Sequence, residues 1–477
     1  MVFFFICFTN GWFACYQVVK NYLYDRDSFL NELRGFTYMF RQTTIFTALF
    51  LTSVTFAEQE FPATLSGHAY LPANTMISAP NNAPDDLHVS GKFTQGIRND
   101  VIGSLEGKSQ GRPTGLSIPF DGQPIQGHSG IKRMNDGSYW LLTDNGAGSK
   151  ANSPDFMLYL NQYDVDFNSN EFKRLKTVFL QDPDKRVPFR IQNEATKARY
   201  LTGADFDPES FQFAGGYLWI GDEFGPYLIQ ATTDGKIVEV FETTFKEETL
   251  RSPDHYALTT PGNPAKTLDF EVLRSKGFEG MAVSHDGSML YPLLEGALVG
   301  TDGSVLQILE FDVAKRQWTG NYWNYPLAQK GLSIGDFNMI DEEYGLVIER
   351  DNGEGVVEFA CQEGEATTTC FDQTNLPKIK RVYKIRMNAD NQQQNVEKIG
   401  YIDLLKIQDP DNLARKALSA GNFVFPFFTI ENVDIVDSET IIVGNDNNLP
   451  FSSSREPNKA DDNELILLNV KSLLDAK

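Results

Sequence analysis

One plan of strand, tight turn and strand recurs five times in this chain of 477 residues. Each copy opens with a polar residue and closes with acidic or amide residues about 13 to 16 positions later. Two strands of about five residues joined by a turn fit that separation. The copies are SGIKRMNDGSYWLLTDNGAG (129–148), ESFQFAGGYLWIGDEFGP (209–226), EGMAVSHDGSMLYPLLEG (279–296), DFNMIDEEYGLVIERDNGEG (336–355) and ENVDIVDSETIIVGNDNN (431–448).

This recurrence predicts an all-β fold. Long helical periodicity is scarce, whereas short runs of β-branched and aromatic residues bounded by turn residues occur throughout. The copies start 57 to 95 residues apart, which leaves room for an outer strand or two after each hairpin. Units of three or four strands are typical of the blades of a β-propeller. We expect six blades, five from the clear units and a sixth from residues 58–128 with a C-terminal strand. The uneven spacing leaves a β-sandwich open.

The acidic ends of the hairpins predict a metal site. In a propeller the inner strands begin near the central channel, so groups at one end of successive hairpins converge on the axis. Clustered carboxylates repel one another unless hard cations neutralise them, and calcium takes six to eight oxygen ligands. We expect calcium, ahead of magnesium or manganese. The predicted ligands are Asp144, Asn145, Glu209, Asp222, Glu279, Glu295, Glu349, Asp351, Glu431 and Asp446, within a wider set that includes Glu223, Asn352 and Asn447.

The same acidic residues can also be interpreted as ordinary turn residues without a ligand. Asp-Gly and Asn-Gly pairs are the usual residues of tight turns, and a single acidic group there is more often a solvated turn than a ligand. The recurrence at a matched position in five units favours a site over five unrelated turns.

The charge of the chain restricts its partners. The sequence has 64 Asp and Glu against 42 Lys and Arg, a net charge of −22, and it has no long basic block. Nucleic-acid binding needs a basic face, so it is excluded. A small anionic substrate would also be repelled unless bound cations reversed the local field. We expect a small anionic or ester substrate and a monomeric protein.

The N-terminal region predicts export. From Met39 the chain has one Arg, an apolar run from Ile45 to Phe56, and Thr55-Phe56-Ala57 in the small-x-small cleavage pattern. This indicates a signal peptide cut after Ala57. The alternative is a membrane anchor, although the run is shorter than the roughly 20 residues of a spanning helix. A secreted or periplasmic protein without a membrane partner is expected.

The domain organisation follows from this interpretation. Residues 1–38 contain charged residues after their first apolar run and are interpreted as an upstream extension from a mis-called start. Residues 39–57 are the signal peptide. Residues 58–110 are an N-terminal segment that completes a blade, and residues 111–477 are one large propeller domain.

Cysteine usage agrees with an oxidising compartment. Cys361 and Cys370 are the two cysteines that remain after residue 57. In an exported chain, such a close pair favours a local disulfide over a metal site.

Several motifs carry a resemblance to a known family. TDNGAG, GDEFGP, GFEGMAVSHDGSMLY, LLEGAL, IERDNGEG and IENVDIVDSETIIVGNDNN resemble the phytase-like family of exported proteins, described as having esterase-like activity related to phytase. The resemblance covers residues from about 110 to 470. It implies a propeller fold and a hydrolase of phosphoesters or other esters. Asn432 departs from the family, which more commonly has glycine after this glutamate, so the close backbone approach that glycine allows is not expected there.

The resemblance also implies a mechanism. Cations held by the acidic cluster would bind a phosphate and activate water, with a free carboxylate as the base. We expect Glu279, Glu295, Glu223 and Arg350 to be the catalytic residues. Arg350 is either an inward phosphate fork or, by strand alternation, a member of an outward salt bridge.

Two other functions stay open. The first is a non-catalytic, calcium-stabilised propeller that binds a ligand or partner, and the second is a lactonase-type or carboxylesterase-type propeller that uses the same cluster. A serine hydrolase has little support, because the G-x-S-x-G pattern at residues 331–335 precedes a strand-like segment where a nucleophile elbow needs a helix. The sequence lacks the HExxH, Walker-type and GxGxxG motifs.

The signal-peptide interpretation predicts the N-terminus of the exported protein. When the gene is expressed in a secreting host, the protein outside the cell should begin at Glu58. Intact-mass measurement and N-terminal sequencing check this. An exported protein that retains residues 39–57 would contradict it.

Overall fold

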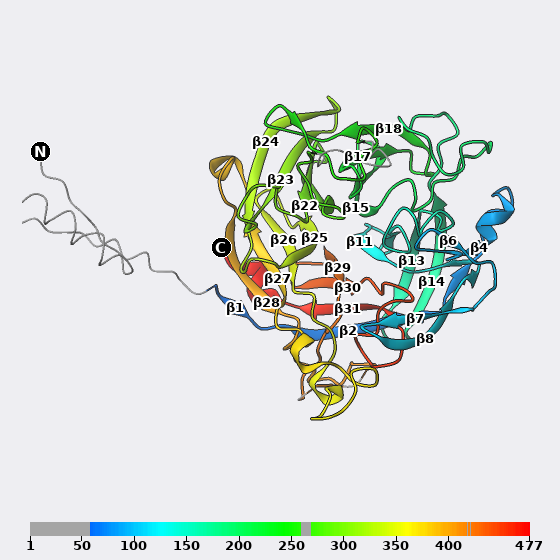
Figure 1. Cartoon of the computed structure of the whole chain (residues 1–477). Helices are drawn as coiled ribbons and strands as arrows, with labels where there is room; N and C mark the ends of the chain where they lie inside the picture. Colours follow the sequence, from blue (N-terminus) through cyan, green and yellow to red (C-terminus); the bar gives the residue numbers. More distant parts are fainter. Residues whose placement is uncertain (1–57, 259–268, 417, 420) are drawn as a thin grey trace, which may run out of the picture. The chain divides into compact units, whose positions relative to one another are not determined.

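Each of the five recurring units forms one antiparallel sheet in the computed structural model, which describes residues 58–477 except 259–268, 417 and 420 (Figure 1). Residues 1–57, with the predicted extension and signal peptide, lie outside the described residues. The first three sheets contain β11 (His128–Arg133), β12 (Tyr139–Thr143), β13 (Tyr159–Asp166) and β14 (Glu171–Phe179); β15 (Pro208–Ala214), β16 (Tyr217–Asp222), β17 (Tyr227–Ala231) and β18 (Ile237–Glu242); and β21 (Phe278–Val283), β22 (Met289–Leu294), β23 (Val305–Asp312) and β24 (Gln317–Pro326).

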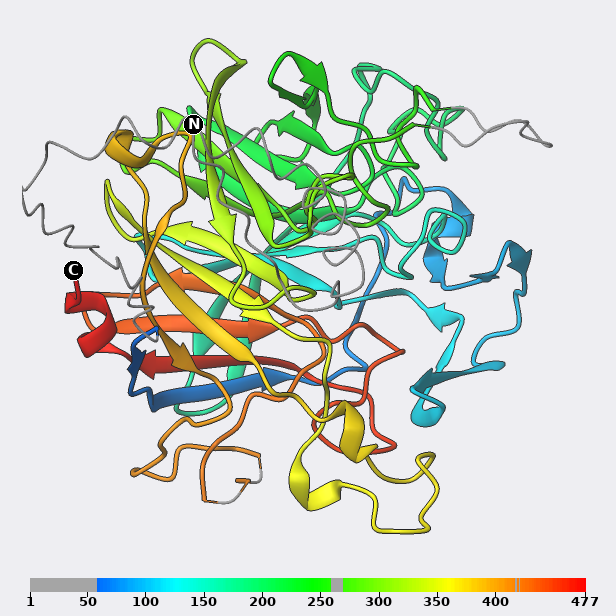
Figure 2. The same cartoon turned by 60° about the vertical axis from the view of Figure 1, so that its left-hand side comes forward.

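The last two sheets are completed by strands from the start of the described chain. The fourth contains β25 (Ser333–Met339), β26 (Tyr344–Arg350), β27 (Lys380–Arg386), β28 (Glu397–Asp403) and β1 (Glu60–Phe61), which pairs parallel with β28. The fifth contains β29 (Ile430–Ile435), β30 (Thr440–Asn445), β31 (Asn463–Asn469) and β2 (Thr64–Leu71). Figure 2 shows β2, in blue, beside β31, in red. One chain segment therefore joins the outer edges of two neighbouring sheets.

The innermost strands of the five sheets form a closed ring. Strands β11, β15, β21, β25 and β29 each lie against the next, and β29 lies against β11. The sheets therefore radiate from one axis, which confirms the expected all-β propeller. Among the described residues no sixth sheet has four strands. After β2, residues up to 128 form short pairs, which are β3 (Met76–Ile77) with β10 (Gln123–Pro124), β4 (Val89–Ser90) with β9 (Phe120–Asp121), β5 (Phe93–Thr94) with β6 (Ile97–Arg98), and β7 (Leu105–Ser109) with β8 (Arg112–Ile118).

A separate hydrophobic cluster fills each of the five junctions between neighbouring sheets. One strand contributes side chains to two clusters, because successive side chains along it point to opposite faces of the sheet. On β16, Leu218 and Ile220 pack toward the first sheet, whereas Trp219 packs toward the third. Burying one such side chain contributes about 1.5–3 kcal/mol. The alternating apolar residues of the sequence thus hold the ring together.

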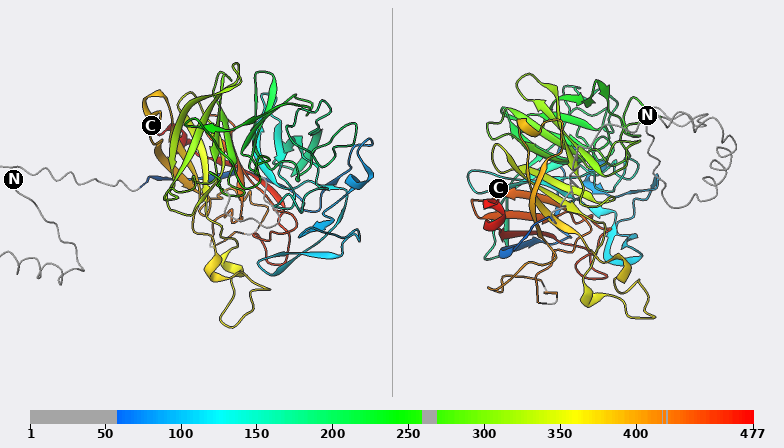
Figure 3. Two further views of the ribbon diagram at one scale, coloured as in Figure 1. Left: turned by 45° about the horizontal axis from the view of Figure 1, so that its top comes forward. Right: turned by 90° about the vertical axis from the view of Figure 1, so that its left-hand side faces the viewer.

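The remaining elements lie outside the five sheets. Figure 3 shows the yellow segment after β26 projecting away from them, and in it Cys361 and Cys370 form a disulfide. The other elements are β19 (Thr244–Phe245), β20 (Glu248–Thr249), the short 3-10 helices η1 (Asp85–His88), η2 (Val357–Phe359), η3 (Gln373–Asn375) and η4 (Ala389–Asn391), and the C-terminal helix α2 (Lys471–Asp475). No helix of the described residues is long and apolar enough to cross a membrane.

Side chains connect three of the junctions between inner strands by hydrogen bonds. The Ser210 hydroxyl donates to the Phe278 carbonyl at 3.2 Å, and an Asp336 carboxylate oxygen accepts from the Val433 amide at 2.9 Å. The Asn432 amide donates to the His128 carbonyl at 2.7 Å. Asn432 therefore bonds to the neighbouring strand where the family more commonly has glycine.

Glycines serve the other close approaches. A Cβ on Gly280 would lie 2.9 Å from both the amide nitrogen and Cβ of Phe337, and a Cβ on Gly335 would collide with the Ile430 carbonyl oxygen. Neither clash can be relieved by turning a flexible side chain, because each involves backbone atoms of the next inner strand.

The ring predicts the effect of filling one of these positions. Gly335→Ala should lower the free energy of unfolding by about 3 kcal/mol, the upper part of the range for overpacking, because β25 must move away from β29. Calorimetric melting temperature measures this. Gly67→Ala in β2 is the control, since its Cβ would meet side-chain atoms of Leu467 and Phe167 at 3.0 Å or more. Equal melting temperatures for Gly335→Ala and wild type would contradict the close approach.

Candidate metal centre

A β-bulge interrupts every inner strand close to the end of its hairpin. It follows the residue that pairs with the last residue of the second strand, or, in the fourth sheet, with the next-to-last residue, Glu349. A bulge leaves one residue unpaired and can re-aim its side chain. The bulge places a glutamate in three sheets, a serine in one and a glycine in one. In ring order these residues are Ser129, Glu209, Glu279, Gly335 and Glu431.

The second strands supply a matching set. In each sheet, the inner-strand residue just before the bulge pairs with a residue of the second strand. The residue that follows this partner in the sequence lies at the end of the hairpin near the axis. In ring order these residues are Asp144, Glu223, Glu295, Arg350 and Asp446. Four sheets therefore present acidic groups, and the fourth sheet presents Gly335 and Arg350 instead. The axial cluster is defined here as these two sets together with Asp207.

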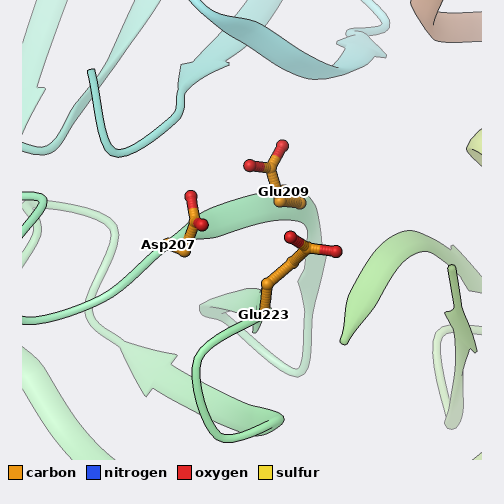
Figure 4. A group of neighbouring side chains, drawn as sticks. All are labelled: Asp207, Glu209 and Glu223. Carbon is orange, nitrogen blue, oxygen red and sulfur yellow. The ribbon is translucent and has the colours of Figure 1, made fainter. Parts of the chain in front are cut away.

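Two groups of three carboxylates in the axial cluster have the spacing of metal ligands. Asp207, Glu209 and Glu223 form the first triad, and Glu223, Glu279 and Glu295 form the second; within each, one oxygen per residue lies within 4.8 Å of the others. Figure 4 shows the first triad, with Asp207 directly before β15, Glu209 in β15 and Glu223 in the segment after β16. Glu223 belongs to both triads.

Each triad contains buried carboxylate oxygens without a hydrogen-bond partner. These are Asp207 Oδ1, Glu223 Oε1 and Glu279 Oε1. The residues are only 2%, 4% and 4% exposed. Buried polar atoms normally have partners, and those that lack one call for an explanation such as an ion.

The proximity of these carboxylates changes their acidity. Burial, followed by the charges of neighbouring carboxylates, raises the pKa of Glu209, Glu223 and Glu279 well above the ordinary value. Burial is also the main cause that raises the pKa of Asp207 to about 8. The cluster is therefore stable in only two forms, either partly protonated or neutralised by cations. Asp and Glu oxygens are the ligands that hard cations such as calcium prefer, so the residues fit such an ion.

Arg350 points into the cluster rather than outward. Its Nη2 donates to Glu431 Oε1 at 2.9 Å and lies 3.7 Å and 3.8 Å from oxygens of Glu279 and Glu295. Its Nε is buried and without a partner, while Nη1 donates to Asn352 at 3.0 Å. The Ser129 hydroxyl donates to the other oxygen of Glu431 at 3.0 Å. Arg350 thus joins carboxylates from two other sheets.

Three other predicted residues, Asp222, Asn145 and Asn447, use their side-chain oxygens to accept backbone hydrogen bonds near the cluster. Both Asp222 oxygens accept backbone hydrogen bonds, from Asp207 and from Gly225, each at 2.8 Å, which fixes the segments that carry two ligands. Asn145 accepts from Ala147 and Gly148 in a turn, and Asn447 accepts from the Gly127 amide.

Asp144 and Asp446 lie in the cluster but already accept hydrogen bonds. Asp144 accepts from Gln126 and the Gly146 amide, each at 2.8 Å. Asp446 accepts from the Asn448 amide at 2.6 Å. Burial comes first among the causes that raise the pKa of both groups.

Two predicted ligands lie apart from the triads. Glu349 accepts from the Tyr325 hydroxyl at 2.8 Å and pairs with Lys398 at 2.6 Å, because it precedes Arg350 and so faces the opposite side of β26. Asp351 accepts backbone hydrogen bonds from Gly353, Lys378 and Ile379. It fixes the loop after β26.

Two polar residues of the axial cluster, and one lysine beside it, are absent from the predicted set. Asp207 precedes Glu209 by two positions, and this period-two spacing on a strand could have identified it. Ser129 occupies the position that Glu209, Glu279 and Glu431 occupy in other units. Lys276, which pairs with Glu295, directly precedes the GFEG motif and carries no other signal.

A closed ring of radiating antiparallel sheets with buried carboxylates on its axis defines a β-propeller with an acidic axial site. The family model described as phytase-like, esterase-like activity of phytase, matches residues 123–449. The chain belongs to this family, and the match contains all five inner strands.

Similar proteins outside the family model are distant. An "Uncharacterized secreted protein" of Arthroderma benhamiae is 25% identical over 122 residues, which are 21% of this chain and 22% of that protein. The chain therefore matches about a fifth of the length of this curated relative.

Solved structures that resemble the chain include the periplasmic gluconolactonase PpgL of Pseudomonas aeruginosa, with 12% identity and a TM-score of 0.29 over 80% of this chain and 99% of that one. An exo-beta-1,3-galactanase of Phanerochaete chrysosporium has 10% identity and a TM-score of 0.35 over 77% and 64%. Likenesses this weak support no conclusion about activity, so the fold assignment rests on the ring of inner strands.

The raised pKa values of the axial carboxylates predict how metal-free protein responds to pH. The folded state holds a proton on Asp207 up to about pH 8, whereas an unfolded aspartate releases it near its ordinary pKa of 3.8. The unfolded state therefore binds fewer protons between these values, so this group lowers stability as pH rises through the window. Asp207→Asn cannot ionise and should gain stability relative to wild type from pH 4 to pH 8.

Melting temperatures of both proteins in chelator, measured across that range, test the prediction. Calcium should reverse the trend, because it binds the deprotonated carboxylates. A constant difference between Asp207→Asn and wild type at all pH values would show that Asp207 does not titrate as described.

Proposed function

We propose that the protein is an exported, metal-dependent hydrolase of phosphoesters or related esters that uses the axial cluster as its active site. The observation that carries the proposal is the convergence of three buried, unpartnered carboxylate oxygens, on Asp207, Glu223 and Glu279, in two triads of metal-ligand spacing. Membership in a family described by an esterase-like activity supports the ester substrate.

The first and second triads would hold the cation, with calcium as the expected ion. When bound, a calcium ion would offset the negative field of the cluster, bind the ester oxygens and lower the pKa of a water molecule. The negative field makes this necessary for an anionic ester, which the net charge of the axial cluster would otherwise repel.

The protein's own residues would perform the remaining tasks. Glu279 offers one carboxylate oxygen to the cation, and its other oxygen would accept the proton of the attacking water. Arg350 has an unpartnered Nε–H that would donate to an ester oxygen as negative charge develops there. Glu431 and Ser129 would hold Arg350 in place.

Export is proposed on three observations. They are the predicted signal peptide, the disulfide between Cys361 and Cys370, and the description of the Arthroderma benhamiae relative as secreted. A secreted or periplasmic location would also supply calcium at higher concentration than the cytosolic sensor range.

One observation favours a second candidate function. The carboxylates of the triads are at most 9% exposed, which also suits an enclosed ion that stabilises a non-catalytic, ligand-binding propeller. A lactonase-type or carboxylesterase-type propeller would use the same cluster to polarise a carbonyl group. Substrate assays separate these candidates.

The proposal predicts calcium-dependent turnover. Purified protein should hydrolyse at least one of a generic phosphomonoester, a phosphodiester and a short-chain carboxylic ester in calcium, and should lose this activity in chelator. Glu279→Gln should lower kcat by at least about 100-fold, as expected when a general base is removed. The substrate that is turned over names the ester class.

Glu349→Gln is the matched control, since it makes the same chemical change on a glutamate outside the triads. It should retain the calcium requirement and the affinity for calcium, provided that circular dichroism shows the fold at the assay temperature. Absence of turnover on all three substrates, with a melting temperature that still falls on chelation, would overturn the enzyme proposal in favour of the binding scaffold.

A further inference from the structure

The two triads that share Glu223 differ in the positive side chains around them. Among the described residues, no nitrogen of a lysine, arginine or histidine lies within 4.0 Å of a carboxylate oxygen of Asp207, Glu209 or Glu223. The first triad therefore has three buried carboxylates and no counter-charge from the protein at contact distance.

The second triad already has two positive neighbours. Lys276 Nζ forms an ion pair with Glu295 Oε2. Arg350 Nη2 lies 3.7 Å from Glu279 Oε1 and 3.8 Å from Glu295 Oε1. A cation that binds this triad must share its carboxylates with both groups.

The positions of these two residues explain the asymmetry. Arg350 stands where the other four sheets place Asp144, Glu223, Glu295 and Asp446, so the fourth sheet contributes a positive charge in place of a negative one. Lys276 lies just before β21, and its side chain is 36% exposed, so solvent reaches it. Arg350 is buried and donates hydrogen bonds to Glu431 and Asn352, whereas Lys276 pairs with Glu295 from a partly exposed position.

We propose that the axial cluster is a two-cation centre bridged by Glu223, with a tight position in the first triad and a weak, exchangeable position in the second. The proposal rests on the proposed function and adds a form of regulation to it. The first cation is resident, and the second binds only when free calcium is high enough to compete with Lys276 and Arg350. Occupancy of the second triad, and with it activity, then follows the calcium concentration outside the cell.

The second position keeps ligands of its own. Glu279 Oε1 and Glu223 Oε1 are buried and make no hydrogen bond, although Arg350 Nη2 lies 3.7 Å from Glu279 Oε1. These oxygens are available to a second ion even while Lys276 remains on Glu295 Oε2.

Isothermal titration of chelator-stripped protein with calcium tests the inference. Wild type should show two binding events of different affinity. Glu209→Gln should remove or weaken the tighter event, and Glu279→Gln should remove the weaker one. Lys276→Met should tighten the weaker event by about tenfold or more, because it removes a positive charge that repels the ion and competes with it for Glu295.

Lys315→Met is the control for the loss of one positive charge. Lys315 also pairs with an aspartate, Asp312 at 2.7 Å, but on the turn between β23 and β24. It should leave both affinities unchanged. A single binding event that Glu209→Gln and Glu279→Gln both abolish would overturn the two-position centre, and unchanged affinities in Lys276→Met would overturn the competition. Wild type that binds no calcium at all would instead refute the proposed function itself.

Discussion

Repulsion between buried carboxylates at the axis is the interaction on which the rest of this structure depends. Asp207, Glu209, Glu223 and Glu279 are buried next to one another, and three of them have a carboxylate oxygen without a hydrogen bond. Without cations the protein holds protons on these groups well above their ordinary pKa, at a cost in stability as pH rises. A bound hard cation would neutralise these charges, and the same carboxylates would then act as its ligands. The stability of the propeller and the proposed activity therefore depend on the same cluster.

The fold resists this repulsion by closing the ring. Five hydrophobic junctions, side-chain hydrogen bonds at three junctions between inner strands, and the two N-terminal strands β1 and β2 hold the sheets around the axis. Close contacts at Gly280 and Gly335 bring the inner strands together. The bulge in four of the five inner strands aims a side chain at the axis. A rigid ring can thus hold like charges at ligand spacing, as a preorganised metal site requires.

The recurrence of one hairpin plan is what made the fold and most of the cluster predictable from sequence. Chemically similar residues at one place in five units reveal both the inner strands and Glu209, Glu279, Glu295, Glu431 and Asp446. The recurring pattern did not predict side-chain orientation where two neighbouring residues of a strand both carry charges. Glu349 and Arg350 are neighbours on β26, and alternation turns the glutamate toward Lys398 and the arginine to the axis. Asp207 is not part of the repeated plan, and the use of β2 in the fifth sheet depends on contacts between the two ends of the domain.

The central claim is that the carboxylates of the two triads bind cations at the axis of the propeller. Anomalous diffraction from crystals grown with manganese, or soaked in a lanthanide that replaces calcium, tests it most directly. The account predicts a strong anomalous peak among Asp207, Glu209 and Glu223, and a weaker one beside Glu279 at high ion concentration. Peaks only at surface carboxylates, with the axial oxygens hydrogen-bonded to one another as protonated pairs, would contradict it.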